Sequence, residues 1–416
     1  MKETSPSDMD LFISAIRNYE KGEFILSLNK IEYLCVKYEH ENPTLMSINL
    51  FFCMQTASKT LDKPNKFEYK LRELIPFIEY CKDQELSSHI KQQYAFYLLD
   101  TKKYTFSEIK YYAKYITPLI ATSSKLNIHY DDMGYFKKND KNKTLLIYVS
   151  GGIGDKIMYC RFIRKVCETN RGNHIIFITD DCLFWIYSHI YSDLANIKVM
   201  KHSERYNLPP FDYHINITML MYYMGITCDT LYTDYYLTNL PESSICMNNS
   251  IIDPSKPNIV INWHGNYENS QEKINRGMEL SQMIPLLEQT NINWISVQKE
   301  VTVEDKKILS KYHVKNLQDI VDIDGDSFKD TLTILKQVDL VISTDTSLAH
   351  IAGTANVECW ILLVCGCEWR WKWRNKEGFS MWYPNMKIIS QPSIGRWDSV
   401  IENVLHALEK RVSSFN

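Results

Sequence analysis

The stretch DLVISTDTSLAHIAG, residues 339–353, decides the fold. Its first half is an apolar, partly β-branched run that predicts a buried strand, and its second half has the composition of a helix. The turn between the two halves consists of five polar residues, Ser343, Thr344, Asp345, Thr346 and Ser347. A buried strand that passes directly into a helix is the repeating unit of parallel α/β sheets.

The same turn is a candidate ligand site. Hydroxyls and amides at a helix N-terminus favour a diphosphate, and Asp345 could accept hydrogen bonds from a sugar. His350 lies one turn into the predicted helix. The residues alone leave a structural alternative open, in which Thr346 or Ser347 caps the helix and His350 is a core histidine.

Similar strand-to-helix units extend on both sides of this stretch. β-branched runs predict strands at 144–149, 174–179, 197–200 and 213–217, and then at 258–263, 293–298, 314–317, 339–343 and 359–363. Turn residues between 239 and 257 separate the two series. We therefore expect two Rossmann-like domains that face a cleft, residues 144–252 and 253–396, followed by a C-terminal helix over residues 397–416.

A glycine-rich turn, VSGGIGDK at residues 149–156, follows the first predicted strand. Gly152 and Gly154 would let the backbone approach a ligand closely, at the start of a helix that runs to about residue 167. Asp155 would face the cleft, or it would merely cap its helix. The signatures GxxxxGK[ST] and GxGxxG are absent, which disfavours a nucleotide hydrolase and a simple dinucleotide-binding protein.

The first 130 residues differ in composition from the rest. Only one of the fourteen glycines precedes residue 130, and all nine tryptophans follow residue 184. Apolar spacing over residues 11–19 and 24–34 predicts a helical hairpin, which resembles one tetratricopeptide-like helix pair without a clean second copy. We expect an all-α module over residues 1–130 and a polar linker over residues 131–143.

Overall composition excludes several classes of protein. The chain has 416 residues, 45% of them hydrophobic, and a formal charge of -3, so a disordered chain and a strongly basic nucleic-acid binder are both disfavoured. No apolar run reaches the ~20 residues that cross a bilayer, and eleven cysteines fit reduced thiols, so we expect a cytoplasmic protein without a transmembrane segment. Paired CxxC and HExxH motifs are absent, so no metal site is expected.

Several motifs occur in an order that resembles the heptosyltransferase-like glycosyltransferases of family nine, in the branch with a helical or tetratricopeptide-like N-terminal region. These motifs are Gly154-Asp155, residues 258–266, Asn275-Arg276, residues 345–353, residues 369–372 and residues 382–384. The resemblance covers about residues 144–411. It implies a GT-B fold and inverting transfer of a sugar, heptose-type or similar, from a nucleotide-diphosphate donor to a protein or glycan hydroxyl. It also implies no cofactor and no obligatory metal.

The resemblance assigns roles to individual residues. Asp155 is implied as the general base that takes the acceptor's proton. Arg276 and the turn at residues 344–347 are implied to stabilise the departing diphosphate, and Asp345 to hold the donor sugar. The other implied donor-binding residues are Gly152, Gly154, Trp263, Gly265, Asn266, Ser343 and His350.

Some alternatives stay open from the sequence. Arg276 lies in a polar, loop-like neighbourhood that also fits an exposed surface residue. His264 and Gly277 depart from the family pattern, so the identity of the sugar does not follow from the resemblance. A catalytically silent nucleotide-sugar-binding protein that recruits a partner is one alternative function, and a nucleotide-sugar epimerase is another.

Overall fold

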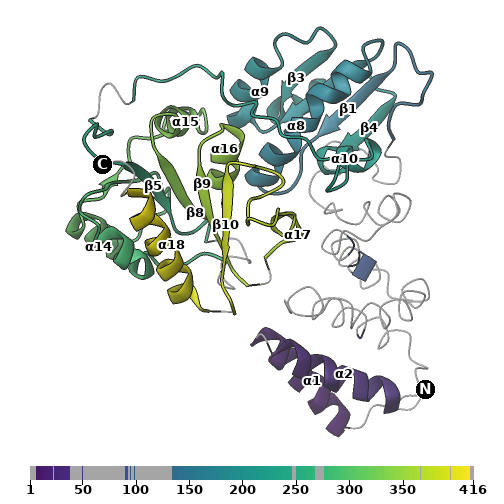
Figure 1. Cartoon of the computed structure of the whole chain (residues 1–416). Helices are drawn as coiled ribbons and strands as arrows, with labels where there is room; N and C mark the ends of the chain where they lie inside the picture. Colours follow the sequence, from purple (N-terminus) through teal and green to yellow (C-terminus); the bar gives the residue numbers. More distant parts are fainter. Residues whose placement is uncertain are drawn as a thin grey trace. The chain divides into compact units, whose positions relative to one another are not determined.

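The structure, a computed structural model, describes residues 6–21, 23–37, 49, 90–91, 94, 98, 134–245, 250–267, 276–365, 367–393 and 395–412. Most of the expected helical module, part of the expected linker, Asn275 and residues 413–416 lie outside the described residues. The helices are α1 (Pro6–Glu20), α2 (Phe24–Lys37), α8 (Ile153–Thr169), α9 (Phe184–Ile190), α10 (Leu220–Tyr223), α13 (Ile284–Leu287), α14 (Val303–Lys311), α15 (Lys329–Leu335), α16 (Ser347–Thr354), α17 (Trp369–Lys372) and α18 (Trp397–Val412) (Figure 1). The strands are β1 (Thr144–Tyr148), β2 (His174–Thr179), β3 (Ile197–Lys201), β4 (Tyr213–Asn216), β5 (Asn258–Asn262), β6 (Asn293–Ser296), β7 (Lys315–Asn316), β8 (Leu340–Thr344), β9 (Cys359–Leu363) and β10 (Met386–Ser390).

Helices α1 and α2 form the predicted helical hairpin. Ala15 and Ile31 are completely buried between the two helices, as apolar positions spaced three and four residues apart require. The Ser27 hydroxyl donates a 2.6 Å hydrogen bond to the Ala15 carbonyl, and Lys37 pairs with Asp8 at 2.5 Å. The prediction of a helix pair here is therefore confirmed.

The first sheet has four parallel strands in the order β3-β2-β1-β4. All four were predicted, β1, β2 and β4 from largely apolar, buried runs and the edge strand β3 from a run that contains two lysines. Residues 134–143, the described part of the expected linker, are bonded to this sheet rather than extended away from it. The Gly134 amide donates to the His214 carbonyl at 3.0 Å, and the Asn142 amide donates to the Gly172 carbonyl at 2.8 Å.

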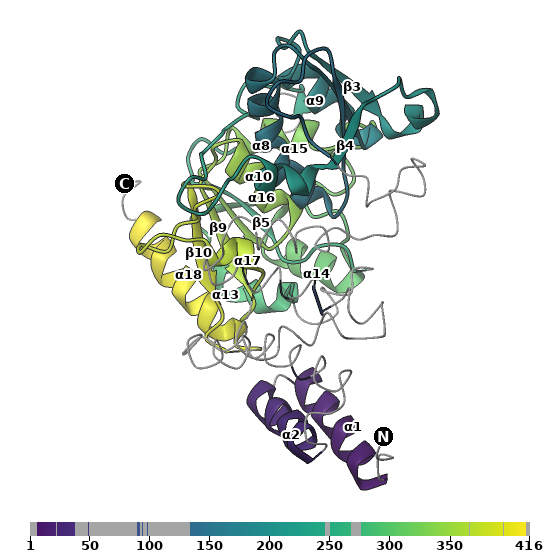
Figure 2. The same ribbon diagram turned by 90° about the vertical axis from the view of Figure 1, so that its right-hand side faces the viewer.

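The second sheet has six parallel strands in the order β10-β9-β8-β5-β6-β7. Numbered from β5, this is the Rossmann order 3-2-1-4-5-6. Helices α13, α14 and α18 cover one face of the sheet and α15 and α16 the other (Figures 1 and 2). The α18 face encloses the main core, with Val400 and Val404 packed against residues such as Ile261 and Ile342. The two α/β sheets confirm the predicted GT-B-like fold class.

Strand β10 was not predicted. Its sequence, MKIIS, contains Lys387 within the apolar run and comes shortly after Pro384, so the local signal is weak. It is the last strand of the sheet on its side, paired in parallel with β9, and an isolated antiparallel bridge joins its Lys387 to Phe379. Packing of α18 against β10 supplies the burial that the sequence pattern does not reveal.

Strand order defines where a ligand site belongs in each sheet. The order reverses between β1 and β4 in the first sheet and between β5 and β8 in the second. Ligands of open α/β sheets bind beyond the carboxyl ends of the strands at such reversal points. The loops after β1, β5 and β8 therefore mark the candidate site, and all three carry residues that the sequence analysis selected.

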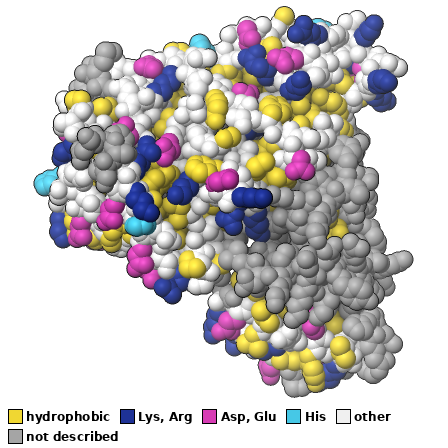
Figure 3. Space-filling view, viewed as in Figure 1, with side chains coloured by type: hydrophobic (Ala, Val, Ile, Leu, Met, Phe, Trp, Pro, Cys, Tyr) yellow, Lys and Arg dark blue, Asp and Glu magenta, His cyan; other side chains and the backbone are white. Residues whose placement is uncertain are grey.

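The surface of the α/β unit is mixed in charge. On the face drawn in Figure 3, lysine and arginine side chains lie among acidic and apolar ones, in keeping with the small net charge. Within the described ranges, no helix has both the length and the hydropathy needed to span a membrane.

Candidate functional site

Asp155 lies in the first turn of α8, directly after the loop that follows β1. Gly151 has a φ of 83° and Gly152 is the N-cap of α8. The Gly152 amide donates a 3.1 Å hydrogen bond to the Asp155 carboxylate, so Asp155 does cap the start of its helix. A Cβ at Gly151 would lie 2.9 Å from the same carboxylate oxygen, which explains why glycine is required there. A carboxylate can accept about four hydrogen bonds, so this cap is compatible with accepting a proton from a substrate.

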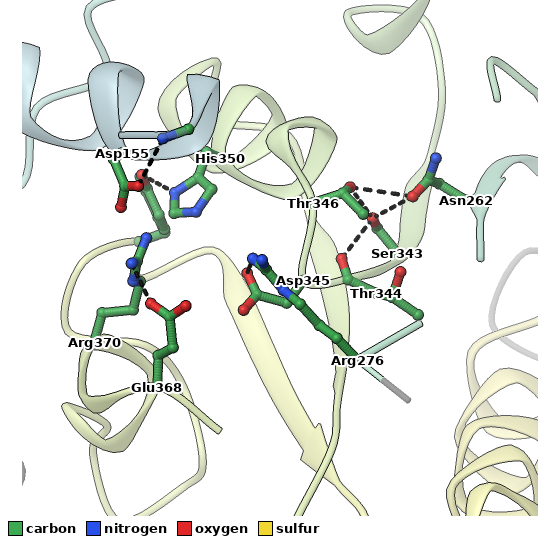
Figure 4. A network of polar contacts seen from close by, with 12 residues as sticks. Asp155, Asn262, Arg276, Ser343, Thr344, Asp345, Thr346, His350, Glu368 and Arg370 are labelled. Atoms are coloured by element: carbon green, nitrogen blue, oxygen red, sulfur yellow. Dashed lines mark hydrogen bonds and ion pairs between the residues drawn. The ribbon is translucent and has the colours of Figure 1, made fainter. Parts of the chain in front are cut away.

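Gly154 brings the start of α8 against the start of α16. A Cβ at Gly154 would lie 2.5 Å from Cδ2 and 3.0 Å from Nε2 of His350. His350 is 1% exposed, and its Nδ1 is 2.8 Å from the Tyr383 hydroxyl. His350 is thus a buried histidine with a partner, and it lies against Gly154, the residue before Asp155. Figure 4 shows the His350 ring near the Asp155 side chain.

A partly buried ion pair joins Asp345, in the loop after β8, to Arg276, which lies between β5 and β6 in the chain. The Arg276 guanidinium lies 3.0 Å from the Asp345 carboxylate, and these side chains are 20% and 6% exposed. Figure 4 shows Arg276 directed at Asp345 beside the turn that leads into α16. The surface alternative for Arg276 is therefore wrong. The site has one fixed cation and one fixed anion at the start of a helix whose dipole favours negative ligands.

Two hydroxyls of this turn, those of Ser343 and Thr346, are hydrogen-bonded within the protein. Thr346 Oγ1 donates to Asn262 Oδ1 at 3.1 Å and lies 3.0 Å from Ser343 Oγ. Asn262 in turn donates to Gln298 at 2.5 Å. Ser343 and Thr344 are completely buried. Thr346 occupies the N-cap position of α16 without a side-chain capping bond, because its hydroxyl turns to Asn262 instead. This network positions the loops after β5, β6 and β8 relative to one another.

A pocket of about 170 Å³ opens beside this network. Four predicted donor-binding residues line it, Gly265, Asn266, Thr346 and Ser347. Its wall also contains polar side chains that were not predicted as site residues, including Asn262, Gln298, Lys299 and Glu300. Gln298 and Lys299 directly follow the end of β6, so the strand-end rule that selected the other loops could have found them.

Trp263 does not line this pocket. It is completely buried in the main core with Ile259 and Ile261, four and two residues earlier on the same face of β5. Its position supports a packing role and corrects the expectation of donor contact, because alternate residues of a strand point to opposite faces.

Within the described ranges, no group of three or more His, Cys, Asp or Glu side chains is arranged to hold a metal ion.

Comparisons with known proteins concern the fold alone. The chain is similar in fold to heptosyltransferases. ADP-heptose lps heptosyltransferase II of E. coli matches with 12% identity and a TM-score of 0.37, over 64% of this chain and 99% of the other. A glycosyl transferase family 9 protein of Veillonella parvula matches with 10% identity and a TM-score of 0.42, over 66% and 98%.

A third match is the dodecameric iron-containing heptosyltransferase TibC of E. coli, with 8% identity and a TM-score of 0.41, over 65% of this chain and 81% of the other. No protein-family model matches the chain, and no curated protein does. Matches at these scores add nothing about substrate or mechanism, so the fold rests on its strand order and the site on its geometry.

Proposed function

We propose that the chain is an inverting glycosyltransferase that moves a sugar, heptose-type or similar, from a nucleotide-diphosphate donor to a hydroxyl of a protein or glycan. One observation carries this proposal. The contact between Gly154 and His350 brings the helix start that bears Asp155 against the helix start that bears Asp345. A carboxylate from one sheet thereby adjoins an anion-binding turn from the other, which is the arrangement that transfer between two substrates needs.

The donor would bind to the second sheet. The pocket of about 170 Å³ is smaller than the roughly 300–1,000 Å³ of typical ligand sites, so it would hold only part of a nucleotide sugar. Lys299 and the backbone amides of the loop after β5 suit the nucleotide portion of the donor. The diphosphate would lie toward Arg276 and the N-terminus of α16, where a cation and a helix dipole favour negative charge.

Asp155 would act on the acceptor. As the acceptor oxygen forms its bond to the anomeric carbon, the bond from that carbon to the diphosphate breaks, and the acceptor's proton passes to the Asp155 carboxylate. Charge grows on the leaving diphosphate, so Arg276 stabilises the transition state more than the ground state. The hydrogen bond from the Gly152 amide orients the carboxylate for this step.

Replacing Asp155 by asparagine tests the proposal against a matched control. Asp305 in α14 occupies the same N3 position and accepts a hydrogen bond from the Thr302 amide at 3.0 Å, just as Asp155 does from Gly152. Both variants, Asp155→Asn and Asp305→Asn, weaken a helix cap, which changes the stability by about 1 kcal/mol. Only Asp155→Asn should abolish transfer, while its donor affinity stays within about twofold of the parent's.

The assay would use ADP-, UDP- and GDP-linked sugars with protein and oligosaccharide acceptors. Transfer by the Asp155→Asn variant at the parent rate would refute the assigned role. Analysis of products also separates the alternatives. A silent binding protein would bind a donor and leave it unchanged with every acceptor, and an epimerase would convert the donor sugar with no acceptor present.

A further inference from the structure

A second cavity lies away from the candidate transfer site. It measures about 370 Å³ and is bounded by the middle of α8, the end of α9 and the segment 234–239. Its α8 residues, Cys160 and Arg164, lie five and nine positions beyond Asp155. That is roughly 8 and 14 Å along the helix axis at the α-helical rise. This cavity is within the size range of small-molecule sites, and the proposed reaction does not use it.

The cation of the cavity is already neutralised. Arg164 forms two hydrogen bonds to Asp193, at 2.8 and 2.9 Å, and a third to the Ile190 carbonyl. A guanidinium held by a carboxylate in this two-pronged geometry has little attraction left for a phosphate or another anion. The cavity therefore differs from the pocket near Asp345, where the electrostatics favour a diphosphate.

Three other polar side chains of the cavity form no hydrogen bond within the part of the chain that the structure describes. Within the described residues, the Asp234 carboxylate accepts no hydrogen bond and forms no ion pair, although the side chain is half-buried. Burial removes water from around the carboxylate and raises the pKa of Asp234. The His189 ring and the Asn239 side-chain amide line the same cavity, and neither forms a hydrogen bond to another described residue.

The wall also offers ring surface. Tyr191, Tyr235 and Tyr236 line the cavity. The hydroxyls of Tyr191 and Tyr236 donate to the backbone carbonyls of Cys160 and Ile157, which fixes their rings in place. A ligand that fits must therefore donate hydrogen bonds to a carboxylate, carry no negative charge and present apolar C–H faces to aromatic rings.

We propose that this cavity is a binding site for an uncharged saccharide unit. Sugar hydroxyls donate to Asp234 and accept from Asn239, and the C–H face of the ring packs on the tyrosines. The site is separate from the transfer site and does not depend on the proposed function. It would hold a sugar beside the helix that carries Asp155, on the side of α8 that faces the segment 234–239.

Binding of defined sugars to the full-length protein tests this site. Saturation-transfer NMR and calorimetry would use glucose, galactose, mannose, N-acetylglucosamine and their common disaccharides. Glucose 6-phosphate and glucosamine serve as the anionic and cationic counterparts. We expect at least one neutral sugar to bind, and Asp234→Ala to weaken that binding by about tenfold or more, because a hydrogen bond to a carboxylate is lost. Arg276→Ala, at the proposed donor site, should leave the affinity for that sugar within about twofold of the parent's.

Three results would overturn the site. They are the absence of binding by every neutral sugar, equal affinity in the parent and the Asp234→Ala variant, and binding of the charged sugars alone. Asn239→Ala, on the exposed rim, is the second variant if Asp234→Ala does not fold, and the same loss of affinity is expected. Donor turnover is measured separately, so failure of this site and failure of the transferase proposal give different results.

Discussion

The ring of His350 lies so close to Gly154 that no side chain fits between them. A Cβ at Gly154 would stand 2.5 Å from Cδ2 of the histidine, although 196 positions of sequence separate the two residues. His350 cannot retreat easily, because it is buried and bonded to the Tyr383 hydroxyl at 2.8 Å. The contact joins the two helix starts on which the proposed chemistry depends.

Gly154→Ala should therefore reduce both stability and transfer. Within a helix, alanine is favoured over glycine by about 1 kcal/mol, so an isolated helix would gain stability. Here the added methyl group must displace His350 or the start of α8, and we expect a lower melting temperature and a transfer rate reduced by about tenfold or more. Thermal unfolding and steady-state kinetics measure the two effects.

Gly172→Ala is the control, because a Cβ there meets nothing within 4 Å and the residue is not in the left-handed region. This control should leave the melting temperature and the transfer rate nearly unchanged. A Gly154→Ala protein as stable and active as the parent would show that the contact between Gly154 and His350 can relax without loss of stability or activity.

The ion pair between Arg276 and Asp345 should affect both donor binding and stability. Arg276→Gln removes the cation and leaves the 6% exposed Asp345 without this ion pair. We expect the free energy of unfolding to fall by about 3 kcal/mol and donor affinity to fall by about tenfold or more. Chemical denaturation and donor titration provide the measurements.

The double variant Arg276→Gln/Asp345→Asn separates these effects. It contains no uncompensated charge at this position, so it should recover part of the lost stability while donor binding stays weak. Donor affinity equal to the parent's in the single variant would exclude Arg276 from the donor site.

The sequence predicts the fold well because parallel strands are buried apolar runs. It predicts Asp155 and Asp345 as site residues in the turns after β1 and β8, and it predicts Arg276 through the family resemblance. It misassigns Trp263, although strict alternation from Ile259 and Ile261 places that side chain on the core face of β5.

The same alternation turns Asn262 to the opposite face, where its Oδ1 accepts a 3.1 Å hydrogen bond from Thr346 Oγ1. That contact joins residues 84 positions apart in the sequence. The meeting of Gly154 with His350 is likewise a property of how the two sheets pack. No local pattern encodes such pairs, because each partner is locally compatible with many neighbours.

A buried arginine on α8 leads to a stability prediction. Arg161 is 1% exposed and donates to the carbonyls of Met158 at 2.9 Å and Trp382 at 2.8 Å. Its guanidinium also lies 4.8 Å from the Tyr383 ring centroid. Arg161→Met keeps the apolar volume but leaves buried carbonyls without a donor, so the free energy of unfolding should fall by about 3 kcal/mol.

Arg164→Met, three residues along the same helix, removes a more exposed arginine whose main partner is Asp193. It should cost less than about 1 kcal/mol. Urea denaturation of both variants gives the comparison. Equal losses would mean that the contacts of Arg161 with Trp382 and Tyr383 contribute little.

Asp234 should have an inverted pH dependence of stability. Burial raises its pKa in the folded protein above the ordinary value of 3.8, so the folded state binds this proton more tightly than the unfolded state. Above the folded pKa the ionised group costs stability, and this cost disappears as the pH falls through the folded pKa toward the unfolded value. Asp234→Asn should therefore be more stable than the parent at neutral pH, and the difference should shrink as the pH is lowered toward 4.

Asp193→Asn should give the opposite sign, because Arg164 lowers the pKa of Asp193 in the folded protein. The parent should be slightly more stable than this variant at neutral pH and should lose that advantage as the pH falls through the unfolded and then the folded pKa. Melting temperatures of the parent and both variants between pH 4 and pH 8 decide the matter. Parallel curves for the parent and Asp234→Asn would show that the Asp234 carboxylate is well solvated, and would weaken the case for a ligand there.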